Sequence, residues 1–189
     1  MKNFLKKGNQ KINISLQDIY EAVLGKNPKS IDFLKREFHS ISINSKKIKK
    51  NDIFVAIKGL NFDGHDYINE AFKNGAIAAI ISNEKKVSSN TILVNDTKKS
   101  LADIASFILK KFNPFIIGIT GSNGKTTTKE IIKSILDSNY GQNNVLATHG
   151  NYNNDIGLPL TIFNLNSSHN HVVLEMGMNH ANEISYLAN

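Results

Sequence analysis

The residues with the clearest chemistry stand in the segment GITGSNGKTTTKE, which spans residues 118–130. An apolar run precedes this segment, and a helix-forming run follows it. In such an arrangement the backbone N–H groups of the glycine-rich turn point at an anion, and the helix N-terminus adds positive partial charge. An ordinary turn with a chance Gly-Lys-Thr is the alternative, but the strand, turn and helix context favours a site for nucleotide phosphates.

Each residue of this loop has an expected part in holding the nucleotide. Gly121 and Gly124 let the backbone approach phosphate oxygens without an intervening Cβ atom. Lys125 is expected to reach the β- and γ-phosphates, and the Thr126 hydroxyl to bind Mg²⁺. The general P-loop pattern has glycine six residues before the lysine, where this chain has Ile119. The expected nucleotide-binding residues are Gly121, Ser122, Asn123, Gly124, Lys125, Thr126 and Thr127.

A second candidate is the acid that follows an apolar run, Glu175. A carboxylate in that place is costly to bury unless it is paired or binds a cation. A P-loop needs an acidic partner for its metal, which favours Glu175 as a Mg²⁺ ligand. A salt bridge to a lysine at the sheet edge remains open as the alternative. Lys125 and Glu175 are therefore the predicted catalytic residues, and Thr126 and Glu175 the predicted metal ligands.

A third unusual stretch is ATHGNYNNDIGLPLT, residues 147–161, where amide and acid side chains crowd together. By composition alone this stretch is a polar loop with turn-forming residues.

Short apolar runs alternate with helix-forming runs along the chain. Strands are predicted at 52–59, 76–82, 91–96, 115–120 and 171–178. Helices are predicted at 15–25, within the segment from Gly64 to its stop at Gly75, at 97–112 and at 125–138. The alternation predicts an α/β fold: a small N-terminal α/β domain, then the start of a P-loop ATPase domain with a largely parallel sheet. The division is expected near residue 96, which gives domains 1–96 and 97–189.

Composition excludes some classes of protein and site. The 189 residues include no cysteine, which excludes disulfides and thiolate metal sites and favours the cytoplasm. No apolar run has the length of a membrane span, so no membrane insertion is expected. The net charge of +7 leaves a nucleic-acid-dependent ATPase open. The densest lysine cluster, NSKKIKKND at 44–52, has no interleaved aromatic residue, so no nucleic-acid partner is expected.

Three segments together resemble the Mur ligase family, which assembles the peptide of bacterial cell-wall precursors: GITGSNGKTTTKE, ATHGNYNNDIGLPLT and VVLEMGMNHANEI. The family's loop has the TGxxGKT form found here. The N-terminal half, with DGHDY at 63–67, resembles the family domain that holds the UDP end of the substrate. Where the family has Asp-Ser-Arg, this chain has Asn44-Ser45-Lys46, so only Ser45 matches.

The resemblance implies an ATP-dependent amide ligase of peptidoglycan precursor synthesis, with ATP and Mg²⁺ as cofactors. The forms GNYNNDIGLPLT and EMGMNH favour the member that adds D-alanyl-D-alanine to UDP-N-acetylmuramoyl-tripeptide through an acyl phosphate. A monomer is expected. Another Mur ligase, a folylpolyglutamate-synthase-like ligase and a non-catalytic nucleotide-binding module remain alternatives. The substrate-binding residues implied are Ser45, Asp63, Gly64, His65, Asn151 and Asn154.

Two expectations concern the end of the chain. The last residues, NEISYLAN, read as the opening of a helix, so we expect a fragment of a longer protein that is inactive alone. His180 belongs either to an Asn-His motif near the substrate or to the surface of that helix.

Overall fold

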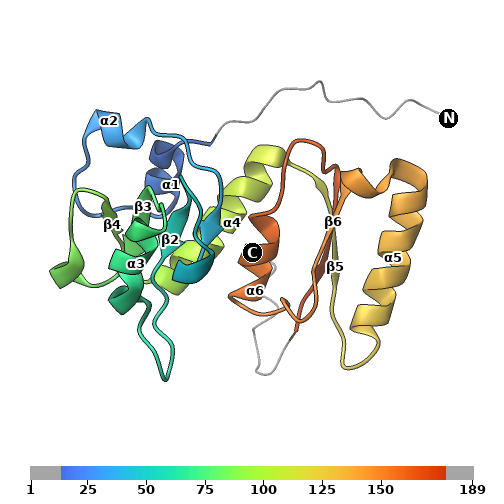
Figure 1. The fold of residues 1–189 in the computed structure, drawn as a ribbon. Helices are drawn as coiled ribbons and strands as arrows, with labels where there is room; N and C mark the ends of the chain where they lie inside the picture. The colour runs from blue at the N-terminus through green and yellow to red at the C-terminus, as the bar shows by residue number, and fades with distance from the viewer. Residues whose placement is uncertain (1–13, 178–189) are drawn as a thin grey trace.

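The computed structural model describes residues 14–177, and His180 lies outside them. Helices alternate with strands that form two parallel sheets, which confirms the predicted α/β class (Figure 1). Within residues 14–177, no helix combines the length and the apolar character that crossing a bilayer requires.

The first sheet has four parallel strands in the order β1-β2-β3-β4. Its strands are β1 (Ile41–Ser42), β2 (Ile53–Val55), β3 (Ala78–Ile81) and β4 (Thr91–Leu93). The helices of this part are α1 (Leu16–Ala22), α2 (Ile31–Leu34) and α3 (Ile68–Lys73). Alternate residues serve opposite faces, as the pleat of a strand requires: Ile53 packs in the core with α1, whereas Phe54 packs in a second core with α3.

The second sheet has three parallel strands in the order β5-β7-β6. Its elements are β5 (Phe115–Ile119), α5 (Lys125–Tyr140), β6 (Val145–Ala147), α6 (Gly157–Ile162) and β7 (His171–Glu175). Helix α5 covers one face, and α6 lies on the other (Figure 1). Ile119 pairs with Glu175 in the β5–β7 register, so the loop after β5 and the end of β7 meet at one edge. In open parallel sheets this carboxyl edge is where ligands bind.

Helix α4 (Thr97–Phe112) joins the cores of the two sheets. Asp96 caps the helix by accepting the backbone N–H groups of Lys98 and Lys99. The Thr97 hydroxyl donates to the carbonyl of Ala56 in the first sheet, at 3.0 Å. Because buried residues of α4 belong to a core that also contains β7 and α6, the division at residue 96 stays a prediction.

The structure differs from the expected elements in two ways. Most strands are shorter than predicted; the run 52–59, for example, forms strand only over Ile53–Val55. Two α-helices, α2 and α6, and two strands, β1 and β6, were not predicted. The expectation of a polar loop over 147–161 is wrong for its second half, which forms α6. Pro159 fits there because the first turn of a helix needs no N–H donor from it.

Candidate functional site

The glycine-rich turn between β5 and α5 has the backbone that its sequence predicts. Gly121 and Gly124 have φ angles of 150° and 76°, and Gly124 is the residue before the first turn of α5. A Cβ at Gly124 would meet nothing within 4 Å, so its left-handed conformation, and not lack of space, favours glycine there. No side chain caps α5, so the N–H groups of its first turn donate to no capping side chain.

Lys125 and Thr126 follow this turn at the start of α5. The Lys125 ammonium donates to the carbonyl of Gly121 at 2.7 Å, so the side chain folds back over the turn. The Thr126 hydroxyl donates to Oε2 of Glu175 at 3.0 Å. The structure thus brings together Thr126, at the start of α5, and Glu175, at the end of β7, which the sequence analysis selected from separate segments.

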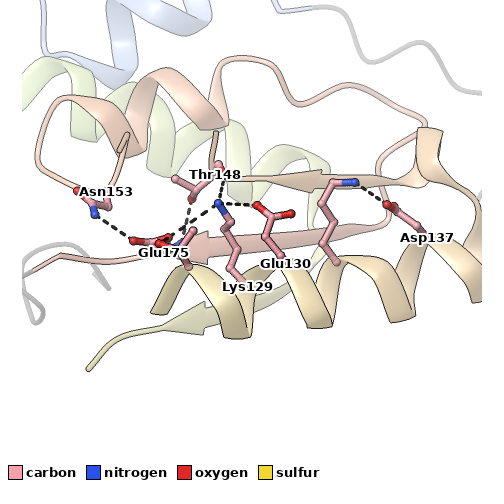
Figure 2. Close-up of polar contacts among 8 residues, drawn as sticks. Lys129, Glu130, Asp137, Thr148, Asn153 and Glu175 are labelled. Carbon is pink, nitrogen blue, oxygen red and sulfur yellow. Dashed lines mark hydrogen bonds and ion pairs between the residues drawn. The ribbon is translucent and has the colours of Figure 1, made fainter. Parts of the chain in front are cut away.

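Glu175 is the centre of a hydrogen-bonded group at the carboxyl edge of the sheet (Figure 2). Its residue is only 3% exposed. The amide of Asn153 donates to Oε1 at 3.1 Å, and the backbone N–H of Glu175 donates to the Thr148 hydroxyl at 2.9 Å. The ammonium of Lys129 lies 3.9 Å from Oε2. Both interpretations of Glu175, as a metal ligand and as the partner of a lysine, therefore remain open, because the carboxylate contacts the predicted metal ligand Thr126 and also Lys129.

Thr126 and Glu175 fit the oxygen ligands that Mg²⁺ requires. An octahedral Mg²⁺ with ligands at about 2.05 Å has neighbouring oxygens about 2.9 Å apart. The two side-chain oxygens are 3.0 Å apart, so both could bind one ion without moving. Within residues 14–177, no group of three or more His, Cys, Asp or Glu residues could hold a metal. Mg²⁺ commonly uses one or two protein ligands together with waters and phosphates, and Thr126 and Glu175 would be two such ligands.

A pocket of about 590 Å³ lies against the first sheet and contains two of the predicted substrate-binding residues, Ser45 and Gly64. Ser45 is buried, and its hydroxyl donates to Oε2 of Glu70 at 2.7 Å. A Cβ at Gly64 would lie 2.7 Å from the backbone N and O of Ile57, so only glycine permits this close approach. Tyr152 of the second part of the chain also lines the pocket.

Asp63 and His65 hydrogen-bond to each other within the fold. The backbone N–H of Ser82 donates to Nε2 of His65 at 3.0 Å, so the ring proton is assigned to Nδ1, which donates to Asp63 at 2.6 Å. The backbone N–H of His65 also donates to Asp63 and holds the pKa of that carboxyl below its ordinary value. The imidazole and the charge of Lys58 act in the same direction. A role of this pair toward a substrate stays a prediction.

The amide-rich stretch contributes a residue that sequence reasoning missed. Asn151 has an exposed side chain, and Asn154 accepts the backbone N–H of Gly157 at 2.7 Å near the start of α6. It is Asn153, between them, that reaches Glu175. The crowding of amides in the sequence signalled the stretch, but nothing in it marked which amide faces the acid. The substrate roles of Asn151 and Asn154 stay predictions.

Lys129 and Thr148 were also missed. Lys129 stands four residues after Lys125, so it lies on the same face of α5, one turn further along. That spacing was available in the sequence, but the partner of the side chain depends on how α5 packs on the sheet. The ammonium donates to the carbonyl of Thr148 at 2.9 Å, just after β6 (Figure 2).

Two models of Mur ligase domains match the chain in succession. The model described as Mur ligase family, catalytic domain, matches residues 37–120. The model described as Mur ligase middle domain matches residues 119–189. The two matches thus join at the end of β5, directly before the glycine-rich turn.

Relatives with assigned names agree. The UDP-N-acetylmuramoyl-tripeptide–D-alanyl-D-alanine ligase of Haemophilus influenzae is 40% identical over 152 residues, which are 79% of this chain and 33% of the relative. Crystal structure I of MurF from Acinetobacter baumannii superposes with a TM-score of 0.81 at 30% identity, covering 94% of this chain and 39% of that one.

A MurF ligase from Thermotoga maritima, solved in complex with ADP, superposes with a TM-score of 0.72 at 40% identity, covering 84% of this chain and 36% of that one. The chain therefore spans about a third of the length of the relatives that it matches. Since the two domain models, the relatives and the structural neighbours agree, this chain belongs to the Mur ligase family.

Proposed function

We propose that this chain supplies the nucleotide site and the UDP-substrate site of a ligase that joins D-alanyl-D-alanine to UDP-N-acetylmuramoyl-tripeptide. The observation that carries the proposal is the contact of Thr126 with Glu175 beside the turn of Gly121 and Gly124. The names of the related ligases give the two substrates. Because the chain spans about a third of those relatives, the activity belongs to the proposal and to the full-length protein.

In this proposal the γ-phosphoryl group of ATP passes to the terminal carboxylate of the tripeptide and forms an acyl phosphate. The amine of D-alanyl-D-alanine then attacks the acyl carbon, and the products are an amide, ADP and phosphate. Phosphoryl transfer depends on positioning and on neutralising the charge of the transferred group. Lys125 supplies positive charge at the turn, and the uncapped N–H groups of α5 bind phosphate oxygens.

Thr126 and Glu175 are the residues that would hold Mg²⁺ in this site. The ion, when bound, supplies further neutralisation of phosphate charge. Asn153 and Thr148 keep the carboxylate of Glu175 in place, because each hydrogen-bonds to a different part of the residue. The ordered position of Glu175 limits the rearrangement needed when the metal nucleotide binds.

The pocket on the first sheet supports the UDP part of the proposal. Exposed lysines at its rim, Lys46 and Lys47, suit the diphosphate, and the rings of Phe62 and Tyr67 suit a stacked base. Tyr152 lines the pocket and Asn153 contacts Glu175, so adjacent residues connect the two sites. The proposal includes a cytoplasmic location, where ATP is available, and a monomer.

The test is product formation by the full-length protein with ATP and Mg²⁺. UDP-N-acetylmuramoyl-tripeptide is offered with D-alanyl-D-alanine, and in parallel with single amino acids; UDP-linked dipeptide and folates are offered as other acceptors. We expect a new amide, detected by mass spectrometry, only with the tripeptide and D-alanyl-D-alanine. Ligation of a single amino acid to the dipeptide or to folate would assign the protein to another member of the superfamily.

A further inference from the structure

Lys129 is a buried lysine that has no part in the proposed reaction. Of the lysines within residues 14–177, it alone is buried, with a relative exposure of 1%. Lysine is almost never fully buried unless it is paired, because an ammonium loses its hydration in the interior. The side chain must therefore have a partner that justifies its position.

Three oxygens surround the ammonium of Lys129 (Figure 2). The Thr148 carbonyl accepts a hydrogen bond at 2.9 Å, Oε1 of Glu130 lies at 3.0 Å, and Oε2 of Glu175 lies at 3.9 Å. The Thr148 carbonyl is neutral. The side chain of Glu130 is 62% exposed, and ion pairs with exposed carboxylates stabilise little, because water solvates them equally well.

Glu175 is different because its side chain is only 4% exposed. The other groups that contact its carboxylate, Thr126 and Asn153, are neutral donors. Within residues 14–177, the ammonium of Lys129 is therefore the positively charged group that forms an ion pair with this buried carboxylate and can balance its charge. Its distance from Oε2 is longer than a hydrogen bond, so the attraction does not occupy the oxygen that also faces Thr126.

We infer that Lys129 is the resident counter-ion of Glu175: it balances the carboxylate in the absence of a metal and opposes binding of Mg²⁺ that arrives without a nucleotide. The inference rests on the proposed metal role of Thr126 and Glu175. A second positive charge at Oε2 would lie close to the ammonium, and like charges at such distances repel strongly where water is excluded. A nucleotide brings phosphate charge that offsets this repulsion, so the metal binds together with the nucleotide.

The experiment measures thermal unfolding of the full-length protein over a range of Mg²⁺ concentrations without nucleotide, at constant ionic strength. The wild type is compared with Lys129→Met, and with Lys129→Gln, which keeps a donor for the Thr148 carbonyl. Without Mg²⁺ both variants should melt below the wild type. Mg²⁺ should raise their melting temperatures more than that of the wild type, with an apparent affinity for free Mg²⁺ that is about tenfold tighter or more.

Control variants separate the counter-ion role from a structural one. Lys133→Met removes a lysine one turn further along α5, which pairs with Asp137, and Glu130→Gln removes the exposed carboxylate near Lys129. Both should keep the Mg²⁺ response of the wild type. In the double variant Lys129→Met with Glu175→Gln, the unpaired charge is gone, so the protein should melt above Lys129→Met, and its extra stabilisation by Mg²⁺ should disappear.

Two results would overturn the inference: a loss of stability in both Lys129 variants that is the same at every Mg²⁺ concentration, or a double variant no more stable than Lys129→Met. If Lys129→Met folds only with Mg²⁺ present, the inference is supported. A failure of the proposed function would be seen in a different measurement. A wild-type protein that binds Mg²⁺ but neither ADP nor the UDP-linked tripeptide would contradict the proposed ligase function. The Mg²⁺ measurement on the Lys129 variants would still be valid.

Discussion

The amide of Asn153 donates to the carboxylate of Glu175 at 3.1 Å, and its neighbour Tyr152 lines the pocket of the first sheet. The backbone holds this arrangement too, since the N–H of Gly177 donates to the carbonyl of Asn153 at 2.7 Å. The loop after β6 is thus attached to the chain at Glu175 itself and at Gly177, two residues after it. A change at the pocket and a change at the carboxylate are therefore expected to affect each other.

Asn153→Ala should weaken the apparent Mg²⁺ affinity of the full-length enzyme by about tenfold, the lower end of the effect of groups that orient metal ligands. The reason is that Oε1 of Glu175 loses its donor and the carboxylate gains freedom to turn. The measurement is a Mg²⁺ titration of ligase activity at saturating ATP. Asn139→Ala, on the exposed end of α5, is the control and should titrate like the wild type.

Glu175→Gln should shift the Mg²⁺ titration of activity to higher concentrations more than it weakens nucleotide binding. The amide keeps the shape of the side chain but is a poor ligand for Mg²⁺, which prefers charged oxygens. The two measurements are the Mg²⁺ titration and calorimetric binding of ADP. If only thermal stability falls, Glu175 acts as the ion-pair partner of Lys129 and not as a metal ligand.

The nucleotide turn and Glu175 could be predicted because each depends on a short stretch of sequence. A glycine-rich turn between a strand and a helix, and an acid closing an apolar strand, are local patterns. The turn and Glu175 lie close together because the carboxyl ends of parallel strands share one edge of the sheet. The pairing of Ile119 with Glu175 in the β5–β7 register is consistent with this. Local sequence patterns and the geometry of a parallel sheet were therefore sufficient to predict that the nucleotide turn and Glu175 belong to one site.

The positions of Lys129, Thr148 and Asn153 around Glu175 could not be predicted because they depend on packing between elements distant in sequence. The spacing from Lys125 gives the face of α5 on which Lys129 lies, but the height of the helix over the sheet decides which oxygen it meets. Helix α6 was missed for a related reason. Gly157 is buried, and a Cβ on it would lie 2.4 Å from the Cα of Tyr152, so the glycine permits close packing here and does not mark a turn.

Gly64→Ala should destabilise the protein by roughly 1–3 kcal/mol, the usual cost of forcing an extra methyl group into a packed site. The added Cβ would lie 2.7 Å from the backbone of Ile57, and backbone cannot move aside as a flexible side chain can. Since Gly64 lines the pocket, binding of the UDP-linked substrate should weaken as well. Chemical denaturation and substrate calorimetry measure the two effects. Gly124→Ala is the comparison, because its Cβ has space and only its left-handed backbone is strained.

Lys125→Ala should lower ligation by roughly 10³-fold or more while the fold stays intact, because charge stabilisation at the transferred group is a large part of such catalysis. The side chain folds over the turn and is only partly buried, so its loss removes little packing. Ligation rate is measured beside the circular dichroism spectrum. Lys85→Ala, an exposed lysine of the first part of the chain, is the control. Near-normal turnover of Lys125→Ala would contradict the nucleotide site.

The stability of the second sheet should fall as the pH drops below about 6.5, the ordinary pKa of histidine. The ring of His171 lies against Tyr140, with centroids 4.2 Å apart, and burial lowers its pKa. Burial lowers the pKa of His169 too, whose Nδ1 accepts the backbone N–H of Asn166. A lowered pKa means that the unfolded chain binds the proton more tightly, so the stabilisation is complete above pH 6.5 and is lost as the pH falls through the lowered values.

His171→Phe tests this origin of the pH dependence, because phenylalanine keeps the contact with Tyr140 and cannot be protonated. Melting temperatures are measured between about pH 8 and pH 5, the range over which histidine changes charge. The variant should lose less stability than the wild type over that range, and His169→Gln combined with it should lose less again. His149→Gln, an exposed histidine, should retain the wild-type slope. If the melting temperature of His171→Phe falls as steeply as that of the wild type, other groups control acid unfolding and the partly buried imidazole does not contribute.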